Sequence, residues 1–337
     1  MTATMGAVMV SMRRIACKAL SVAALLLALG SLNLAQAQSD YPNKPVRVIV
    51  PFAAGGVADI TTRIVSEKLG GKLGQRFVVE NAPGAGGIAA ARAAISGGPD
   101  GYTLALLTNG TAISVPLFKS LPFDPLKDFT PISSFGYFDG LFIANAASEY
   151  RTLQDFVKAA RAKPGTLNVG TINPGSTQNL TAELFKSTAD IDFVIVPFRT
   201  TPEAIIALLR GDIHMVVDFY AALKPGLVDE KTRAIAWSGA KPSPALPNVS
   251  TVQQAGVAGF EVVSWNALYA PAGTSPAIIN TLNRALHDVL ADPEIRKRAL
   301  ELGIETRASS PAEIDARMRA DIQKWTAVIA RAGIQRQ

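Results

Sequence analysis

Short apolar runs alternate with amphipathic stretches over most of this chain. The runs are rich in β-branched residues and predict buried strands, while apolar residues three or four positions apart between them predict helices. Ile60, Ile64 and Leu69, for example, share one face of a predicted helix. Strands that alternate with helices are typical of βαβ units, so we predict an α/β fold with mostly parallel sheets. The predicted strands are Val46–Val50, Phe77–Glu80, Tyr102–Leu107, Leu141–Ala144, Leu167–Gly170, Phe193–Val196, His214–Asp218, Arg233–Trp237 and Val262–Ala270.

The C-terminal part of the chain contains only helical patterns. Pro276–Leu290, Pro293–Leu302 and Pro311–Ala332 each begin with a proline, which favours the first turn of a helix. We expect these helices to cover a sheet that begins earlier in the chain.

The length of 337 residues indicates two domains, because one hydrophobic core rarely exceeds about 250–300 residues. No stretch is long or biased enough to be a flexible linker, so structured segments must join the domains. Phe138–Ala144 and Gly259–Trp265 are the extended segments best placed to cross between them. We therefore expect residues 39–140 plus 261–337 to form the first domain and residues 141–260 to form the second.

The N-terminus has the pattern of a cleaved signal peptide. Basic residues at 13, 14 and 18 precede the short apolar stretch Leu20–Leu29, and Ala35-Gln36-Ala37 fits a cleavage site. A membrane anchor is the alternative, but the apolar stretch is shorter than the roughly 20 residues that span a bilayer. We expect residues 1–37 to be removed after Ala37 and the mature protein to be periplasmic.

Composition narrows the chemistry of the mature chain. Cys17 is the only cysteine and lies in the signal peptide, so we expect no disulfide, no thiolate nucleophile and no Cys-ligated metal. The net charge of +6 falls to +3 when the three basic residues of the signal peptide are removed. Basic residues are scattered rather than interleaved with aromatic ones, so we do not expect a nucleic acid partner.

Two glycine-rich turns connect predicted strands to predicted helices. Val46–Val50 is followed by a turn that contains Gly55 and Gly56, and Phe77–Glu80 by one that contains Gly84 and Gly86. Glycines let the backbone approach a ligand, and the free N–H groups of a first helical turn attract anions. Because ligands bind at the carboxyl ends of parallel strands, both turns are candidates for an anion site. Tight packing alone is the alternative interpretation.

The second predicted domain has a comparable turn at residues 170–179, where Ser176 can be both an N-cap and a ligand donor. Asp59 and Asp218 have two possible roles each. As a cap, Asp59 stabilises a helix, but in a ligand site it repels a carboxylate unless water or a ligand ammonium group lies between them. A protonated nitrogen on the ligand is therefore possible.

Motifs of other functions match only in part. Gly84-x-Gly86-x-x-Ala89 fits the dinucleotide fingerprint, but the nearest downstream acid, Asp100, is closer than the usual spacing of about 20 residues. Ser238-Gly239-Ala240-Lys241 fits S-x-x-K of the penicillin-recognising enzymes but follows a strand and has no companion motif. His214 and His287 are the only histidines, and neither has a partner spaced for a metal site or a catalytic triad. We expect no cofactor and no metal.

Several segments, in order, resemble one known family. They are Val50-Pro51-Phe52-x-x-Gly55-Gly56-x-x-Asp59-x-x-x-Arg63, Asn81-x-Pro83-Gly84-Ala85-Gly86-Gly87, Pro99-Asp100-Gly101-Tyr102-Thr103-Leu104, Leu121-Pro122-Phe123-Asp124-Pro125-x-Lys127-Asp128-Phe129, Val196-Pro197-Phe198-Arg199, Leu246-Pro247-x-Val249-x-Thr251, Glu261-x-x-x-Trp265 and Ala270-Pro271-Ala272-Gly273-Thr274. From about Tyr41 onward the chain resembles the tripartite tricarboxylate transporter substrate-binding receptors, also called the Bug (Bordetella uptake) family.

The resemblance implies a type II periplasmic binding protein fold, in which two α/β domains joined by two crossing segments close on a ligand in the cleft between them. It implies binding of a small carboxylate. We expect a monomer whose ligand is a dicarboxylate, an amino acid or an aromatic acid and which delivers that ligand to a two-component membrane permease. Three departures bear on the ligand: Ala53 and Ala54 stand where prolines are usual, Asn179 where histidine is common, and Thr200 where glycine is frequent.

The residues expected to contact the ligand lie in or beside the turns of both domains. They are Phe52, Ala53, Ala54, Gly55, Gly56, Asp59, Gly84, Ala85, Gly86, Asn109, Thr171, Gly175, Ser176, Asn179, Arg199 and Asp218. A secreted α/β enzyme acting on an organic acid and a ligand sensor for a membrane kinase are the alternative functions. The absence of a complete catalytic motif argues against the enzyme, whereas transport and sensing use the same clamp.

Overall fold

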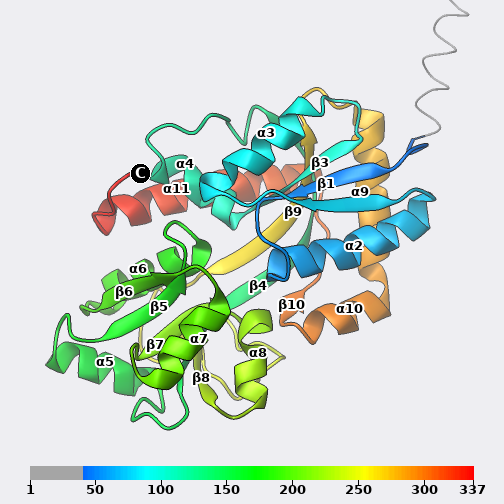
Figure 1. Ribbon diagram of the computed structural model, residues 1–337. Coiled ribbons are helices and arrows are strands. Elements are labelled where there is room, and N and C mark those ends of the chain that lie inside the picture. The colour runs from blue at the N-terminus through cyan, green and yellow to red at the C-terminus, as the bar shows by residue number, and fades with distance from the viewer. Residues whose placement is uncertain (1–40) are drawn as a thin grey trace, which may run out of the picture. The chain divides into compact units, whose positions relative to one another are not determined.

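The computed structural model describes residues 41–337. The predicted signal peptide, with its cleavage site and Cys17, lies outside these residues. Contacts divide the chain into Met1–Asn43 and a compact unit from Lys44 to Gln337, and the description below concerns the second unit. Its strands form a curled sheet of two parts, which we call the first and second half-sheet (Figure 1).

The first half-sheet has the strand order β2-β1-β3-β9-β4. Its strands are β1 (Val46–Val50), β2 (Phe77–Asn81), β3 (Thr103–Thr108), β9 (Val263–Pro271), the long β4 (Phe129–Asn145) and the short β10 (Ile304–Glu305), which pairs with β4. β1 pairs in parallel with β2 and β3, and β9 is antiparallel to both β3 and β4. A strand from the last quarter of the chain therefore lies in the middle of this sheet.

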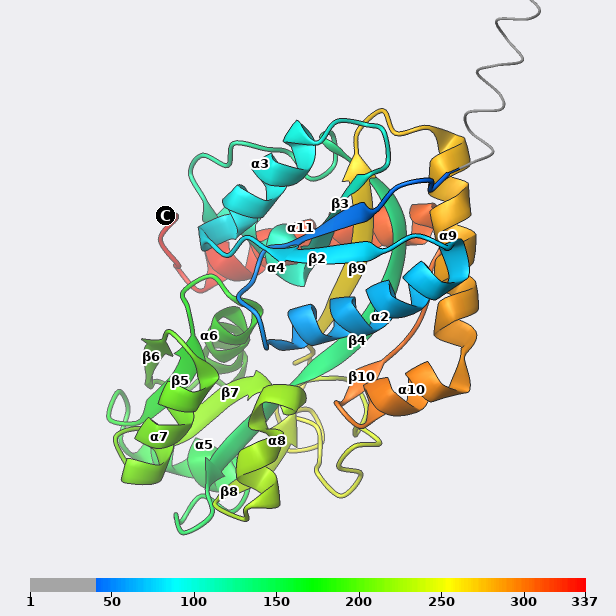
Figure 2. The same cartoon turned by 45° about the vertical axis from the view of Figure 1, so that its right-hand side comes forward.

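Helices cover both faces of the first half-sheet (Figure 2). On one side lie α3 (Ile88–Ser96), α4 (Asn109–Leu117) and α11 (Pro311–Arg331), whose apolar residues share a core with β3 and β9. On the other side lie α2 (Val57–Leu73) and α9 (Pro276–Ala291), which contact each other, and α10 (Pro293–Leu300) packs against α9. The three C-terminal helices thus cover the sheet as predicted.

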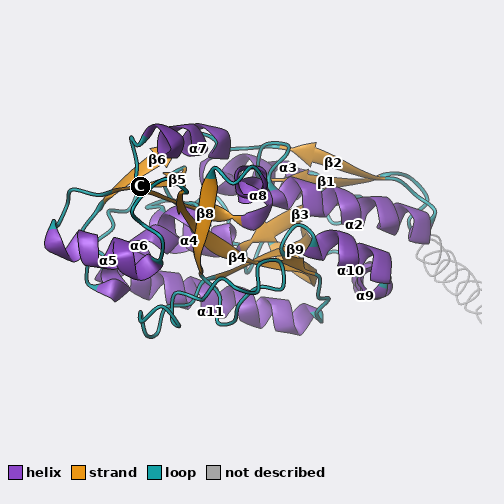
Figure 3. Cartoon of the chain, turned by 90° about the horizontal axis from the view of Figure 1, so that it is seen from below, coloured by secondary structure: helices purple, strands orange, loops and turns teal. Residues whose placement is uncertain are grey.

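The second half-sheet continues from β4 through β7 (Met215–Phe219) and β5 (Asn168–Ile172) to β6 (Val194–Phe198), and β8 (Thr232–Trp237) also pairs with β4. α5 (Leu153–Ala162) and α6 (Thr177–Ala189) supply Phe156 and Phe185 to the core on one face. α7 (Thr201–Arg210) and α8 (Tyr220–Val228) supply Leu208 and Leu223 on the other. Seen from below, the helices flank the strands on both sides (Figure 3).

β4 belongs to both half-sheets. Up to Asp139 its residues pair with β9 and β10, and from Gly140 they pair with β7 and β8. The segment Phe138–Ala144 therefore runs from one half-sheet to the other, as predicted. Beside it, Val262 N–H donates to Ser238 O at 2.8 Å, immediately before β9 begins. The exact bounds of the two domains stay a prediction.

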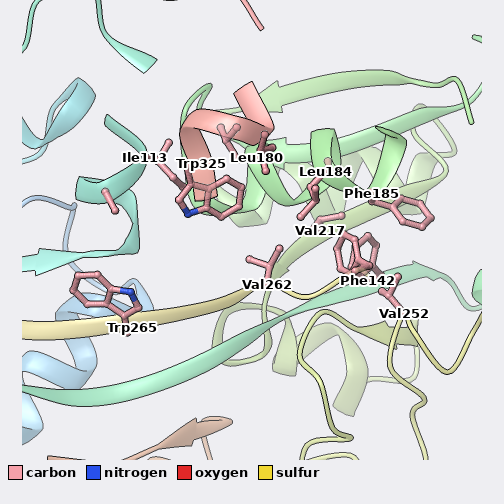
Figure 4. Close-up of a cluster of buried hydrophobic side chains, with 14 of the residues drawn as sticks. Ile113, Phe142, Leu180, Leu184, Phe185, Val217, Val252, Val262, Trp265 and Trp325 are labelled. Carbon is pink, nitrogen blue, oxygen red and sulfur yellow. The ribbon is translucent and has the colours of Figure 1, made fainter. Parts of the chain in front are cut away.

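Each half-sheet with the helices that cover it is called a half of the protein below. One apolar cluster extends through both halves. It includes Trp265 and Trp325 of the first half and Phe142 and Phe185 of the second, with Val262 between them (Figure 4). All nine predicted strands are confirmed to within one or two residues, except that β4 begins twelve residues earlier than predicted, at Phe129.

Candidate functional site

The first glycine turn is held open by a buried carboxylate. Asp59 is only 3% exposed, and it accepts Gly55 N–H at 2.9 Å and Arg63 Nε at 3.0 Å, while its ion pair with Arg63 brings Nη2 to 2.9 Å. Asn81 Nδ2 donates to Asp59 Oδ1 and to Phe52 O, each at 2.9 Å. Asp59 therefore braces the turn from inside, whereas Phe52, Ala53, Ala54, Gly55 and Gly56 are exposed.

The pKa of Asp59 is lower than that of an ordinary aspartate. Burial opposes its ionisation, but the hydrogen bonds from Arg63, Gly55 and Asn81 favour the charged form and outweigh burial. The carboxylate is thus ionised, and its charge is balanced by Arg63, which lessens its repulsion of a bound anion.

The second glycine turn lies beside the first. Ala82 N–H donates to Val50 O at 2.8 Å, so the ends of β1 and β2 remain joined where both turns begin. Gly86 has φ +64° and approaches Phe118, so a side chain there would be strained and crowded. Gly84 and Ala85 are exposed at the start of α3.

Helix capping distinguishes these turns from the other helix starts. The helices α4, α5, α6, α7, α9, α10 and α11 each have a Ser, Thr or Asp side chain that accepts a first-turn N–H. α2 and α3, which follow Gly56 and Gly87, and α8, which follows Phe219, have no side-chain cap. Uncapped N–H groups carry partial positive charge and can bind an anion. At the start of α3, however, the N–H groups of Gly87 and Ile88 already donate to Gly84 O and Ala85 O.

The uncapped start of α8 is a feature of the second half that the sequence did not reveal. Phe219, its N-cap, packs edge-on against Phe138 with ring centroids 4.7 Å apart. Val57, the first residue of α2, packs against the cluster that contains both rings. Residues at the uncapped starts of α2 and α8, one from each half, therefore contact the same apolar cluster. The aromatic residue after a buried strand gives no recognisable capping signal, which is why this helix start was missed.

The carboxylate of Asp218 accepts hydrogen bonds from residues of the second half. It is 2% exposed, and it accepts Gln178 Nε2 at 2.8 Å, Thr201 Oγ1 at 2.5 Å and Phe219 N–H at 2.7 Å. Burial raises its pKa, and these three hydrogen bonds oppose that shift. Asp218 thus joins the starts of α6, α7 and α8, as Asp59 braces the first turn.

The turn before α6 is also organised by its own side chains. Asn179 Oδ1 accepts Gly175 N–H at 3.2 Å, and Asn179 Nδ2 donates to Thr171 Oγ1 at 3.2 Å. Ser176 caps the helix by accepting Asn179 N–H at 3.1 Å. Arg199, before α7, is exposed.

Asn109 lies between the two halves. Its Nδ2 donates to Thr177 Oγ1 of α6 at 3.3 Å, and its Oδ1 accepts Trp325 Nε1 of α11 at 2.8 Å. Leu117 of α4 also meets the face of Gly175 on which a Cβ would lie. Of the expected site residues, Asn109 of the first half and Gly175 of the second are therefore brought together around α4 and α6.

The remaining candidate chemistry has structural partners. Ser238 accepts Gly140 N–H and donates to Val262 O, both at 2.6 Å, so the serine of the S-x-x-K match connects the two crossing segments. His214 Nδ1 accepts Asn168 N–H at 2.9 Å. Among residues 41–337 no three His, Cys, Asp or Glu side chains gather as metal ligands would. A surface hollow of about 540 Å³ near Arg161, Lys186 and Arg331 shares no residue with the turns.

Comparison with known proteins decides the family. Residues 61–334 match the family model described as tripartite tricarboxylate transporter family receptor. The chain belongs to this family. These receptors are binding proteins rather than enzymes, which confirms the expected absence of catalysis and the predicted family resemblance.

Individual relatives are similar to this chain over nearly its whole length. Protein BugT of Bordetella pertussis is 28% identical, with 93% of this chain and 97% of BugT covered. Rpa4515 of R. palustris, solved with adipate, has a TM-score of 0.82 and 31% identity over 88% of this chain and 99% of its own. MatC from Rhodopseudomonas palustris, solved with bound malate, has a TM-score of 0.77 and 31% identity over 86% of this chain and 100% of its own.

These matches confirm the predicted type II periplasmic binding protein fold with two α/β domains. A search of the helices among the described residues found none long and apolar enough to cross a membrane.

Proposed function

We propose that this receptor captures a small carboxylate between its two halves, at the starts of α2 and α8, and delivers it to a two-component membrane permease. The observation that carries the proposal is the capping pattern. Only α2, α3 and α8 among the α-helices of residues 44–337 lack a side-chain cap, and residues at the starts of α2 and α8 contact one apolar cluster from the two halves.

The charges around this junction favour an anion. Asp59 is neutralised by Arg63, and Asp218 is hydrogen-bonded within its own half, so neither carboxylate opposes the free N–H groups. Recognition by main-chain donors suits a carboxylate of variable skeleton, in line with adipate and malate in the related structures. A ligand ammonium group near Asp59 is disfavoured, because Arg63 already pairs with that side chain.

In this proposal the two halves move about the crossing segments Phe138–Ala144 and Gly259–Trp265, so that residues 141–260 close on residues 39–140 plus 261–337. The chain acts as a monomer in the periplasm after loss of residues 1–37. Energy for uptake comes from the permease, which recognises the closed form.

A thermal-shift screen of mono-, di- and tricarboxylates tests the proposal. A ligand at 100 times its dissociation constant should stabilise the protein by about 2.7 kcal/mol. Gly55→Ala should abolish most of the shift, because Gly55 has φ +86° and its N–H anchors the first turn. Gly98→Ala is the matched control, since Gly98 has φ +76° with equally open space outside the site. Absence of a shift with every carboxylate would contradict the proposal.

A further inference from the structure

A buried amide beneath the start of α2 has no partner. Asn266 of β9 is 0% exposed, and neither its Nδ2 nor its Oδ1 has a hydrogen-bond partner among the described residues. The other two buried amide side chains of residues 41–337 are both satisfied: Asn109 by Thr177 and Trp325, and Gln178 by Asp218. Buried polar groups are nearly always hydrogen-bonded, so Asn266 calls for a polar partner outside the chain.

The strand geometry places this amide under α2. Trp265 donates to Asp321 of α11, so the next residue, Asn266, points to the opposite face of the sheet. Its Cα partner on β4 is Gly136, and a Cβ on Gly136 would lie 3.3 Å from Thr61 Cγ2 of α2. Paired residues share a face, so Asn266 faces α2 near Thr61.

This position is close to the anion site. Thr61 Oγ1 donates to Val57 O, so the part of α2 that Asn266 faces lies about one helical turn, roughly 6 Å along the axis, from the uncapped helix start. On the other side Asn266 pairs with Thr108, the last residue of β3, at the edge where the strands end and the candidate site begins. Gly136, the partner of Asn266 on β4, has no side chain, and a Cβ there would lie 3.2 Å from Ile304 Cγ2.

We propose that Asn266 is a positioning residue of the binding site, which holds a hydroxyl group beneath the first turns of α2. The inference rests on the proposed function. An amide offers one donor group and one acceptor, and a hydroxyl group matches both at once. Water and a ligand hydroxyl have this same chemistry. A bound hydroxyl group would satisfy this amide. It would also fix the position of the α2 start relative to the ligand.

The test compares stability and affinity in Asn266→Leu. Removing an unpaired amide should raise the melting temperature of the ligand-free protein by about 2 to 4 °C, while affinity falls at least tenfold. A purely structural role would move both quantities in the same direction. Asn266→Ala repeats the measurement with a smaller side chain if the leucine variant does not fold.

Tyr269→Phe is the matched control. Its hydroxyl is also buried and unpaired, but it lies on the α11 face of the same strand, so the variant should gain stability and keep wild-type affinity. The probes are malate, its deoxy analogue succinate, and adipate, measured by calorimetry. An affinity loss confined to malate would identify a ligand hydroxyl, and an equal loss for all three would identify water.

Two results would overturn the inference: unchanged affinity in folded Asn266→Leu, or a fall in melting temperature that accompanies the fall in affinity. If wild-type protein binds none of the probes or any other carboxylate, the proposed function fails instead, so the two failures are distinguishable.

Discussion

Asn109 of α4 and Thr177 of α6 join the starts of two helices from different halves, with Asn109 Nδ2 3.3 Å from Thr177 Oγ1. The same amide accepts the indole N–H of Trp325, so α4, α6 and α11 meet at one side chain. This buried contact connects the site to the core that both halves share.

Removing this contact should lower the free energy of unfolding, and the loss should be larger when more buried polar groups are left unpaired. Asn109→Ala leaves the Trp325 N–H without an acceptor and should lower the free energy of unfolding by about 1 to 3 kcal/mol. Thr177→Val should lower it by about 1 kcal/mol. Urea unfolding measures both. Thr326→Val, which removes an exposed hydroxyl from α11, should change stability by less than about 0.5 kcal/mol. Equal values for all three variants would exclude a special role for Asn109.

Asp59 should make the protein less stable in acid. Its pKa is lowered on folding, so its contribution is present above the ordinary aspartate pKa of about 3.9 and is lost as the pH falls through the lower, folded value. Asp59→Asn should therefore cost about 1 to 3 kcal/mol at pH 7, and the difference from wild type should shrink below about pH 4. Denaturant unfolding across this pH range checks it. A constant difference down to pH 2 would show that charge is not the cause.

Asp139 should have the opposite pH dependence. Burial, together with the nearby Glu261 and Glu305, raises its pKa to about 7. Its carboxylate also lies against Gly239, where the chain leaves β8. Because the folded state favours the protonated form, stability is complete near pH 4, falls as the pH rises toward 7, and then levels off.

Asp139→Asn should therefore be neutral at pH 4 and stabilising at pH 8, by something on the order of 2 to 4 kcal/mol. Asp212→Asn, at an exposed position before β7, is the control and should change stability by less than about 0.5 kcal/mol. Thermal melts from pH 4 to 8 would make the comparison, and equal stabilisation at both ends would contradict it.

Ser238 should matter for the joint between the halves rather than for catalysis. Ser238→Ala removes two short hydrogen bonds to Gly140 N–H and Val262 O, and should cost about 1 to 3 kcal/mol and lower ligand affinity. Ser133→Ala is the control, since Ser133 makes a similar pair of buried bonds within the first half. It should cost a similar free energy and leave affinity unchanged. Loss of affinity in both would point to general destabilisation.

The sequence predicted the elements whose apolar pattern is continuous. β1, β3 and β7 are buried runs and lie where expected. The first part of β4 was missed because Thr130, Ser133 and Ser134 interrupt its pattern, and two irregularities in its pairing with β9 break the alternation. α8 was missed because its start has no capping signal and because it contains Pro225 and Gly226. Both elements depend on partners distant in sequence.

The turns of the candidate site were predicted from the sequence, but the hydrogen bonds between its side chains were not. The glycines of the first two turns are visible as a local pattern. That Asp59 faces inward depends on Asn81, which lies 22 residues away and reaches it only after β1 and β2 pair. The unsatisfied amide of Asn266 likewise has no sequence signal, because the lack of a partner appears only when the strands and α2 are assembled.

The central place of β9 in the first half-sheet dictates an order of folding. β9 lies between β3 and β4, so the first half-sheet cannot close until residues 263–271 are available. By contrast, residues 140–237 contain every strand of the second half-sheet and can pair among themselves. In a chain that emerges N-terminus first, we therefore expect the strands of the second half-sheet to pair before those of the first half-sheet are complete. During that interval β1 to β3 have exposed edges, and a chaperone that binds extended apolar segments should protect residues 46–108.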